Sequence, residues 1–511
     1  MAYEIEDKDT RPTLIPKYWS DKDVLERAKD FVKQQLERAL PDHKSREQKW
    51  LLWDQVYRLI DTQKPTDGGC NIVDPEPQII VDVMKANYVE AFFSEDPSFE
   101  YKGQEGTDDD QAEIMTAYRA DHLRRINLRE KFERSIHQYC VFGTAVCKDP
   151  WRKEVTKRVV REKIPVRDEQ GNPTFDAKGR PKLKVQQKTV AFPKWDDTDW
   201  EYVSLFDFFW VGKGSDVQEL EGVMHRVRVN WDKLKSSERK TEKVDGNEVT
   251  TGIYSNLDSL TPTSAEDFDL IEYWGRIPKW VLTGKDEDKY ITWEGVISAV
   301  IDVDTTWEAV QKSAHAEKTG EITEFKTNPP VGEAAIRCQE NPFIHGERPF
   351  RLCPHTPVED ELLGIGMIEP IVDKWHELNT TIRQLVDNKT LMLLNPTIED
   401  ANANVQREVK LIKFPRIKAD DVNAVQPLRI NDFSANGWQV IQALKDDIRR
   451  GSGALETIQG IPMKDERVSA TEFQGSYQAA GVRIKNRIRM LDEKLYKKFL
   501  VHVAQFDITL F

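Results

Sequence analysis

The sequence contains few cysteines and no long apolar run. Its five cysteines are scattered over 511 residues, and no close pair has the spacing of a zinc site. We therefore expect buried free thiols in a reducing compartment. No run approaches the roughly eighteen consecutive apolar residues of a membrane span. The acidic start at 1–9 lacks the apolar core of a secretory signal, so we expect neither a membrane segment nor a signal peptide.

The motifs that mark nucleotide-binding and zinc enzymes are incomplete. Residues 212–215 read Gly-Lys-Gly-Ser, but the Gly-x-x-x-x-Gly-Lys-Ser/Thr frame of a phosphate loop is absent. His376 and Glu377 resemble part of the zinc-protease helix, but Thr380 stands where the second histidine belongs. One imidazole cannot hold zinc. These patterns favour a protein that is not an enzyme and has no catalytic residues, metal or cofactor.

Two clusters of acidic residues are compatible with a metal site. Asp96, Glu100 and Lys102 are the residue types of a Mg²⁺-dependent nuclease. They lie around a proline turn, which favours an exposed charged loop. Asp196 and Asp199 lie between strands, where they form either a loose cation site or an ordinary polar loop. A metal-dependent nuclease is therefore the least favoured alternative.

The charge balance limits how the protein can meet nucleic acid. The chain is 39% apolar and 32% charged and has 14 tryptophans, which is typical of a folded protein with a polar surface. Its net charge of −14 argues against gripping DNA over the whole surface. It does not exclude local contact with DNA, although a surface that neutralised many phosphates would hold DNA fast.

The first 350 residues divide into a helical part and a mainly β part. Apolar spacing predicts helices over 20–41, 50–60, 78–94 and 107–140, the first two separated at Pro41. From residue 141 onward, alternation predicts strands, including a basic hairpin over 157–165 and 182–192 that projects as an arm. Asn230 suits the cap of a short helix, and 236–266 are expected to form a polar loop. The predicted fold class is α+β.

Two long helices around an insert are predicted farther along. The first begins after Gly364-Ile-Gly366, with Pro370 in its first turn, and ends near Pro396. The second runs into Gly451 and Gly453, where a kink or break is expected. Steps of three and four residues place apolar side chains on one stripe of each helix. These are Ile368, Ile371, Trp375, Leu378, Ile382 and Leu385 in the first, and Ile441, Leu444 and Ile448 in the second.

Three further segments complete this part of the chain. The insert, 395–433, has a strand pattern at 409–414 and a group of basic residues over 407–418, namely Arg407, Lys410, Lys413, Arg416 and Lys418. They suit DNA or an acidic partner, and equally a solvated strand edge. The second helix is followed by a broken loop: Ile461, Pro462, Met463, Lys464, Asp465, Glu466 and Arg467. Ser469 and Glu472 then form a capping box that begins a third helix.

The order of these pieces resembles the portal proteins of tailed double-stranded-DNA phages. The resemblance rests on the Asn- and Gln-rich helix after Gly364-Ile-Gly366, its end at Asn395-Pro396, and the loop before Ser469-Ala-Thr-Glu472. It is best over 340–505 and looser over 80–230. It implies a structural ring of twelve subunits at the capsid vertex, the head-to-tail connector. That ring forms the channel for genome packaging and ejection.

The resemblance also implies a domain order. Residues 1–361 would form a wing, helical over 1–140 and mainly β over 141–350. Stem helices would span 362–394 and 434–458, with a clip at 395–433 between them. Residues 459–468 would form a tunnel loop facing the DNA, and 469–511 a long helix toward the wing with at most a short crown. The stripes of the stem helices are expected to pack mainly between subunits.

The implied partners are those of a genome channel. They are further copies of the chain, double-stranded DNA, the terminase large subunit, head–tail adaptor or neck proteins, and the major capsid and scaffolding proteins, with no membrane. Assembly is expected in the host cytoplasm and the final location in the virion. The alternative function is another neck or adaptor ring of the virion.

Overall fold

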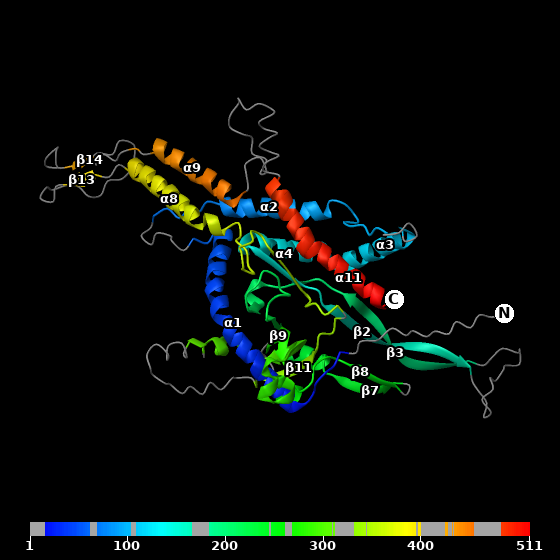
Figure 1. Cartoon of the computed structure of the whole chain (residues 1–511). Coiled ribbons are helices and arrows are strands. Elements are labelled where there is room, and N and C mark those ends of the chain that lie inside the picture. The colour runs from blue at the N-terminus through cyan, green and yellow to red at the C-terminus, as the bar shows by residue number, and fades with distance from the viewer. Residues whose placement is uncertain are drawn as a thin grey trace, which may run out of the picture.

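The computed structural model describes residues 16–61, 69–103, 109–165, 183–244, 247–260, 268–308, 310–311, 332–343, 345–394, 397–399, 425–427, 432, 434–453 and 482–510. Within these ranges helices and strands are mixed, which confirms the α+β class (Figure 1). Two features leave the central body on opposite sides. One is the helix pair α8 (Val372–Leu394) and α9 (Ser434–Ser452), and the other is the arm β2 (Trp151–Pro165) and β3 (Leu183–Thr198).

Helix α1 (Lys22–Tyr57) joins the two halves of the body. Its first half buries Phe31 and Val32 against a sheet, and its second half buries Trp50 and Trp53 in the helical core. The expectation of two helices separated at Pro41 is wrong, because α1 continues through this residue. Pro41 is exposed, so its ring disturbs neither core. The lost backbone hydrogen bond is outweighed by apolar burial on both sides.

Helices α2 (Glu76–Phe93) and α4 (Leu128–Phe142) pack beside the second half of α1, and α3 (Asp109–Arg125) packs against α4. The single helix predicted over 107–140 is wrong, because the chain breaks between α3 and α4. Asn127 there has a left-handed φ of 54°, and its Nδ2 donates to Glu130 Oε2 at 2.5 Å. Asparagine tolerates this conformation because its short side chain can bond locally.

An antiparallel five-stranded sheet forms the other half of the body. Its order is β11 (Ala334–Glu340), β10 (Thr292–Val300), β9 (Phe268–Pro278), β6 (Gly222–Val229) and β5 (Phe208–Val211). Successive residues of a strand face opposite sides. Ile271 and Tyr273 therefore pack with the first half of α1, while Leu270 packs with Leu257 in a second cluster.

A three-stranded sheet connects the two halves. β1 (Thr144–Lys148) lies between β12 (Phe350–Pro354) and β4 (Glu201–Tyr202). Lys148 forms a buried ion pair with Glu272 of β9. Burial alone would raise the pKa of the Glu272 carboxyl, but attraction to Lys148 and their hydrogen bond outweigh burial and lower the pKa to about 2. The two sheets are thus joined by a charged contact as well as by apolar packing.

Shorter elements surround the large sheet. The predicted cap is confirmed: Asn230 accepts a hydrogen bond from the Lys233 N–H at 3.0 Å and begins α5 (Trp231–Ser236). The polar loop expected over 236–266 is wrong for its first part, which forms the hairpin β7 (Lys240–Val244) and β8 (Asn247–Thr251). Another short helix, α6 (Trp280–Thr283), follows β9.

The C-terminal helical region crosses the body. Residues 482–491 are helical and continue through a π-helical turn, Asp492–Tyr496, into α11 (Lys497–Leu510). Leu491, Leu495 and Phe499 of this region are fully buried. Phe499 packs edge-on against Trp200, with ring centroids 5.0 Å apart. No helix in the described ranges has the length and apolar character needed to cross a membrane.

Candidate functional site

The helix pair α8–α9 begins at a junction of three glycines. A Cβ on Gly143, which has φ +84°, would lie 2.3 Å from the Gly364 carbonyl oxygen and 2.4 Å from the Gly366 nitrogen. The Gly364 N–H donates to Thr144 Oγ1 at 2.9 Å, and the Met367 N–H donates to the Cys140 carbonyl at 2.9 Å. The Gly-x-Gly sequence before α8 therefore allows two backbones to touch.

The apolar stripe of the helix pair is buried within a single chain. Ile368, Ile371, Trp375, Leu378, Leu385, Ile441 and Ile448 are buried, and Ile382 and Leu444 are partly buried against the same core. Five of these residues, Ile368, Ile371, Trp375, Leu378 and Ile448, have 0% exposure, so no second chain can cover them further. The expectation that this stripe packs mainly between subunits is therefore corrected. Other residues of the pair must make any contact with a neighbour.

Two glycines bring α9 close to α8. A Cβ on Gly437 would lie 2.8 Å from Leu385 Cδ1, and one on Gly451 would lie 3.3 Å from Ile371 Cγ2. The helix ends at Ser452, and Gly453 follows with φ +77°. This confirms the predicted break at Gly451–Gly453. A left-handed glycine directly after the last turn is a common way for a helix to end.

A network of acidic residues holds the base of the helix pair; we call it the base network. Asp61 accepts from Arg383 Nη2 at 2.6 Å, Asp74 lies 2.6 Å from Lys445 Nζ, and Glu76 accepts from Arg449 Nε at 2.6 Å. Asn379 of α8 accepts from the Asp74 N–H at 2.9 Å, and Trp375 Nε1 donates to the Asp74 carbonyl at 2.9 Å. The segment that precedes α2 thereby binds both helices of the pair.

Sequence reasoning missed the base network and the role of Gly143. Asp61 and Arg383 are 322 residues apart, and nothing in the local pattern around either residue indicates its partner. Gly143 had a usable signal, because a glycine between a helical stretch and a strand suits a helix C-terminus.

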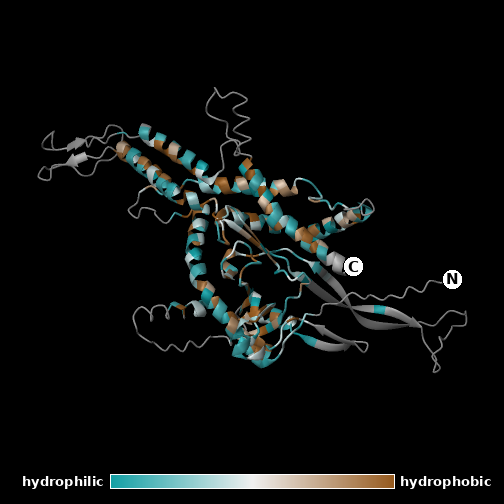
Figure 2. Ribbon diagram, in the orientation of Figure 1, coloured by the Kyte–Doolittle hydropathy of each residue, from teal (hydrophilic) through white to brown (hydrophobic). Residues whose placement is uncertain are grey.

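The far end of the helix pair carries exposed apolar side chains. Leu393 of α8 is 84% exposed, Leu394 is 69% exposed, and Trp438 of α9 is 52% exposed. Lys389 Nζ lies 5.2 Å from the Trp438 ring centroid. Beyond the helices, β13 (Thr397–Glu399) pairs antiparallel with β14 (Val425–Pro427). Figure 2 shows hydrophobic and hydrophilic residues mixed along both helices. Apolar residues at such exposure favour a contact with another molecule.

Two of the predicted site groups lie outside the described residues. These are the loop Ile461, Pro462, Met463, Lys464, Asp465, Glu466 and Arg467, and the basic set Arg407, Lys410, Lys413, Arg416 and Lys418. The predicted strand at 409–414 and the capping box at Ser469 and Glu472 also fall there.

The acidic groups weighed as metal sites are bound by cationic side chains. Asp96 accepts from Arg124 Nη2 at 2.9 Å in an exposed pair, and Glu100 lies 3.7 Å from Lys102. Asp199 pairs with Lys131 and with Arg152. Among the residues that the structure describes, no group of three His, Cys, Asp or Glu side chains could hold a metal ion.

The cysteines are structural. Cys140, Cys147, Cys338 and Cys353 are buried, Cys70 is partly buried, and none forms a disulfide. Burial raises the pKa of the Cys140 and Cys353 thiols to about 12. These thiols therefore stay protonated at neutral pH and are poor nucleophiles.

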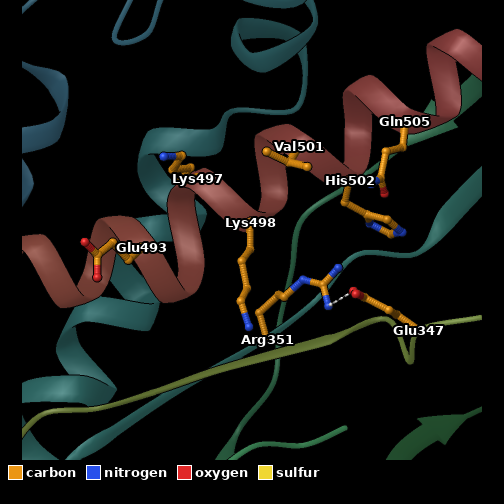
Figure 3. A pocket seen from close by; sticks show the side chains of 8 residues that line it. All are labelled: Glu347, Arg351, Glu493, Lys497, Lys498, Val501, His502 and Gln505. Carbon is orange, nitrogen blue, oxygen red and sulfur yellow. Dashed lines mark ion pairs between the residues drawn. The ribbon is translucent and has the colours of Figure 1, made fainter. Parts of the chain in front are cut away.

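A cavity of about 400 Å³ lies beside α11, lined by Glu347, Arg351, Glu493, Lys497, Lys498, Val501, His502 and Gln505 (Figure 3). Arg351 Nη1 lies 3.3 Å from Glu347, and Arg351 Nε lies 3.4 Å from the fully buried carboxylate of Asp149. His502 Nδ1 lies 3.3 Å from the same carboxylate. The charges are matched across three elements, so this cluster attaches α11 to the small sheet.

The comparisons with known proteins bear on the N-terminal half. Residues 28–279 match the family described as Phage SU10 portal protein. The match runs from α1 to the end of β9 and includes the arm β2–β3. It therefore lies outside 340–505, where the resemblance was expected to be best, and covers 80–230, where it was expected to be looser. No curated protein matches the chain.

Proposed function

The chain belongs to the phage portal proteins, and we propose that it forms a twelve-subunit ring whose central channel carries double-stranded DNA during genome packaging and ejection. The family places it in the virion, as part of a capsid-associated oligomeric ring. The family match carries this proposal. The portal family is structural rather than enzymatic.

In the proposed ring, α8 and α9 are the stem and residues 395–433 the clip. Support comes from the geometry of the pair, which leaves the body, reverses at β13–β14 and returns (Figure 1). Residues 1–361 would form the wing and 459–468 the tunnel loop, with Lys464 and Arg467 as basic and Asp465 and Glu466 as acidic collars. The long C-terminal helix, 469–511, would extend toward the wing. Mixed collars would contact phosphates weakly, and the net charge of −14 suits a sliding contact.

The partners follow from the same placement. The clip, with the basic group Arg407, Lys410, Lys413, Arg416 and Lys418, would face the terminase large subunit during packaging and the adaptor or neck proteins afterwards. The wing would face the major capsid and scaffolding proteins. Assembly in the host cytoplasm would precede incorporation at the vertex.

The test is the oligomeric state of the purified full-length chain. We expect negative-stain images to show rings with a central hole, and native mass spectrometry to give about twelve times the subunit mass of 59.2 kDa. A chain that stays monomeric at micromolar concentration contradicts the proposal.

The exposed apolar end of the helix pair supplies a paired variant for this test. We expect Leu393→Glu with Leu394→Glu to lower the ring fraction, because the new charges would be buried against the neighbouring stem. The matched control is Tyr290→Glu with Ile291→Glu, two residues that are 92% and 53% exposed at a site far along the chain from the stem. Equal losses in both variants would argue against stem contacts through these leucines.

A further inference from the structure

The outer part of the arm β2–β3 is a two-stranded antiparallel ribbon. We define the ribbon as residues 155–165 and 183–193, which pair from Val155 with Pro193 to Pro165 with Leu183. Eleven pairs at about 3.3 Å give a length of about 36 Å. No other described strand pairs with either edge. Figure 1 shows the arm leaving the body on the side away from α8 and α9.

The base of the arm is firmly held. Arg119 Nη1 of α3 donates to Asp197 Oδ1 at 3.0 Å, and His122 Nε2 lies 2.8 Å from the Thr198 carbonyl. Two guanidinium groups contact the Trp195 ring, with Arg125 Cζ at 5.4 Å and Arg152 Cζ at 5.6 Å from its centroid. A register shift at Glu154–Val155 then separates this base from the ribbon. The arm is therefore built to project in a fixed direction.

A lone strand pair of this length needs a surface to lie on. A two-stranded hairpin is at best marginally stable in water, and its free edges offer unpaired N–H and C=O groups. The three-stranded and five-stranded sheets, by contrast, are covered by α1, by the helical core or by short elements. No described strand extends the ribbon, so its free edges are available to another molecule.

The charge of the ribbon indicates which molecule. Its sequence contains six basic residues, Lys157, Arg158, Arg161, Lys163, Lys184 and Lys188, and one carboxylate, Glu162. The whole chain has a net charge of −14, so the rest of the chain is more acidic than the total. A basic ribbon on an acidic protein is complementary to a second copy of that protein.

We propose that the ribbon lies across the acidic surface of the adjacent subunit and fastens each subunit to the next. This inference rests on the proposed ring. It adds a contact on the side of the subunit opposite the stem pair. The contact is electrostatic, so it contributes to partner choice and assembly rate and weakens with salt.

The first experiment identifies the contact in the wild-type ring. Rings are assembled from equal amounts of unlabelled and ¹⁵N-labelled full-length chain and treated with a zero-length carbodiimide, which joins lysines to carboxylates. We expect mixed-isotope cross-links that contain Lys157, Lys163, Lys184 or Lys188. Amide hydrogen exchange over 155–165 is expected to slow at least about tenfold on assembly, because opening of the ribbon then requires breaking the contact.

The second experiment compares two charge reversals of equal size. We expect Lys157→Glu with Arg161→Glu to raise the concentration needed for half-assembly about tenfold or more. The control, Lys285→Glu with Lys289→Glu, changes exposed lysines away from the arm and is expected to leave assembly close to wild type. The difference between the variants should shrink from 50 to 500 mM NaCl.

The outcomes separate this inference from the proposed function. Rings whose ribbon gives only single-isotope cross-links, and whose amides exchange as in the monomer, overturn the contact and leave the ring intact. Protection that appears only when duplex DNA is added means that the ribbon binds DNA and also overturns it. A wild-type chain that forms no ring overturns both proposals.

Discussion

At the scale of single residues, position 143 accepts only glycine, because it lies where the helical core contacts the segment that leads into α8. Its φ of +84° is unfavourable for any residue with a Cβ, and a Cβ would overlap the backbone of Gly364–Gly366. The backbones of Gly143 and of Gly364–Gly366 cannot move apart independently. The Gly364 N–H donates to Thr144, and the His355 N–H donates to the Gly143 carbonyl at 2.7 Å. The sequence revealed Gly364 and Gly366 as a helix start. It did not reveal that they meet a third glycine.

We expect Gly143→Ala to lower the free energy of unfolding by about 3 kcal/mol, the sum of left-handed strain and overpacking. The control is Gly346→Ala, where φ is +71° and no atom lies within 4 Å of the added Cβ. Strain alone predicts a loss of about 1 kcal/mol there. Urea denaturation followed by tryptophan fluorescence measures both. Equal losses of unfolding free energy in the two variants would mean that the close contact with Gly364 adds nothing to the cost of Gly143→Ala.

At the scale of elements, the attachment of α8 depends on charge as well as on apolar packing. Asp61 is 1% exposed in its side chain, and Arg383 approaches it from α8 with 5% exposure. His376 Nδ1 lies 3.3 Å from the same carboxylate, so the histidine weighed as a zinc ligand is part of this attachment. The base network therefore fixes the angle at which the helix pair leaves the body.

We expect Asp61→Asn to destabilise the protein by about 3–5 kcal/mol, because it leaves the buried Arg383 charge without its partner. Hydrogen exchange in α8 should accelerate together with this loss. Asp96→Asn serves as the matched change, since Asp96 and Arg124 form an exposed pair whose loss costs under about 1 kcal/mol. An unchanged exchange rate in α8 would show that apolar packing alone holds the helix.

At the scale of the whole molecule, buried neutral histidines couple stability to pH. Burial lowers the pKa of His43 to about 4, and that of His225 and His355 to about 3. The unfolded chain binds these protons near the ordinary value of 6.5. Below that pH the unfolded state therefore binds protons at these histidines, whereas the folded state does not. Stability is complete above pH 6.5 and falls as the pH drops toward 4.

We expect the melting temperature to fall steadily between pH 6.5 and 4.5, with each histidine contributing about 1.4 kcal/mol per pH unit. His43→Gln should flatten this dependence by one histidine's share, whatever its effect at neutral pH. Differential scanning fluorimetry from pH 7.5 to 4.5 measures both proteins. Parallel curves would show that His43 titrates normally in the fold.

Local patterns in the amino-acid sequence were enough to predict the helices with a strong apolar period, the α+β class, the hairpin arm, the end of α9 and the cap at Asn230. Each is set by neighbours a few residues apart. The predictions at Pro41, at Asn127 and for the first part of 236–266 were wrong. At Pro41, packing on both sides of the helix overrides local propensity, and at Asn127 one left-handed residue does so.

Which side chains meet is a property of the tertiary structure. It brought Asp61 to Arg383, Gly143 to Gly364, and Lys148 to Glu272, pairs that lie far apart in the chain. It also packs the apolar stripe of α8 against the core of the same chain. Contacts between distant segments depend on where whole elements lie, and no local pattern contains that information.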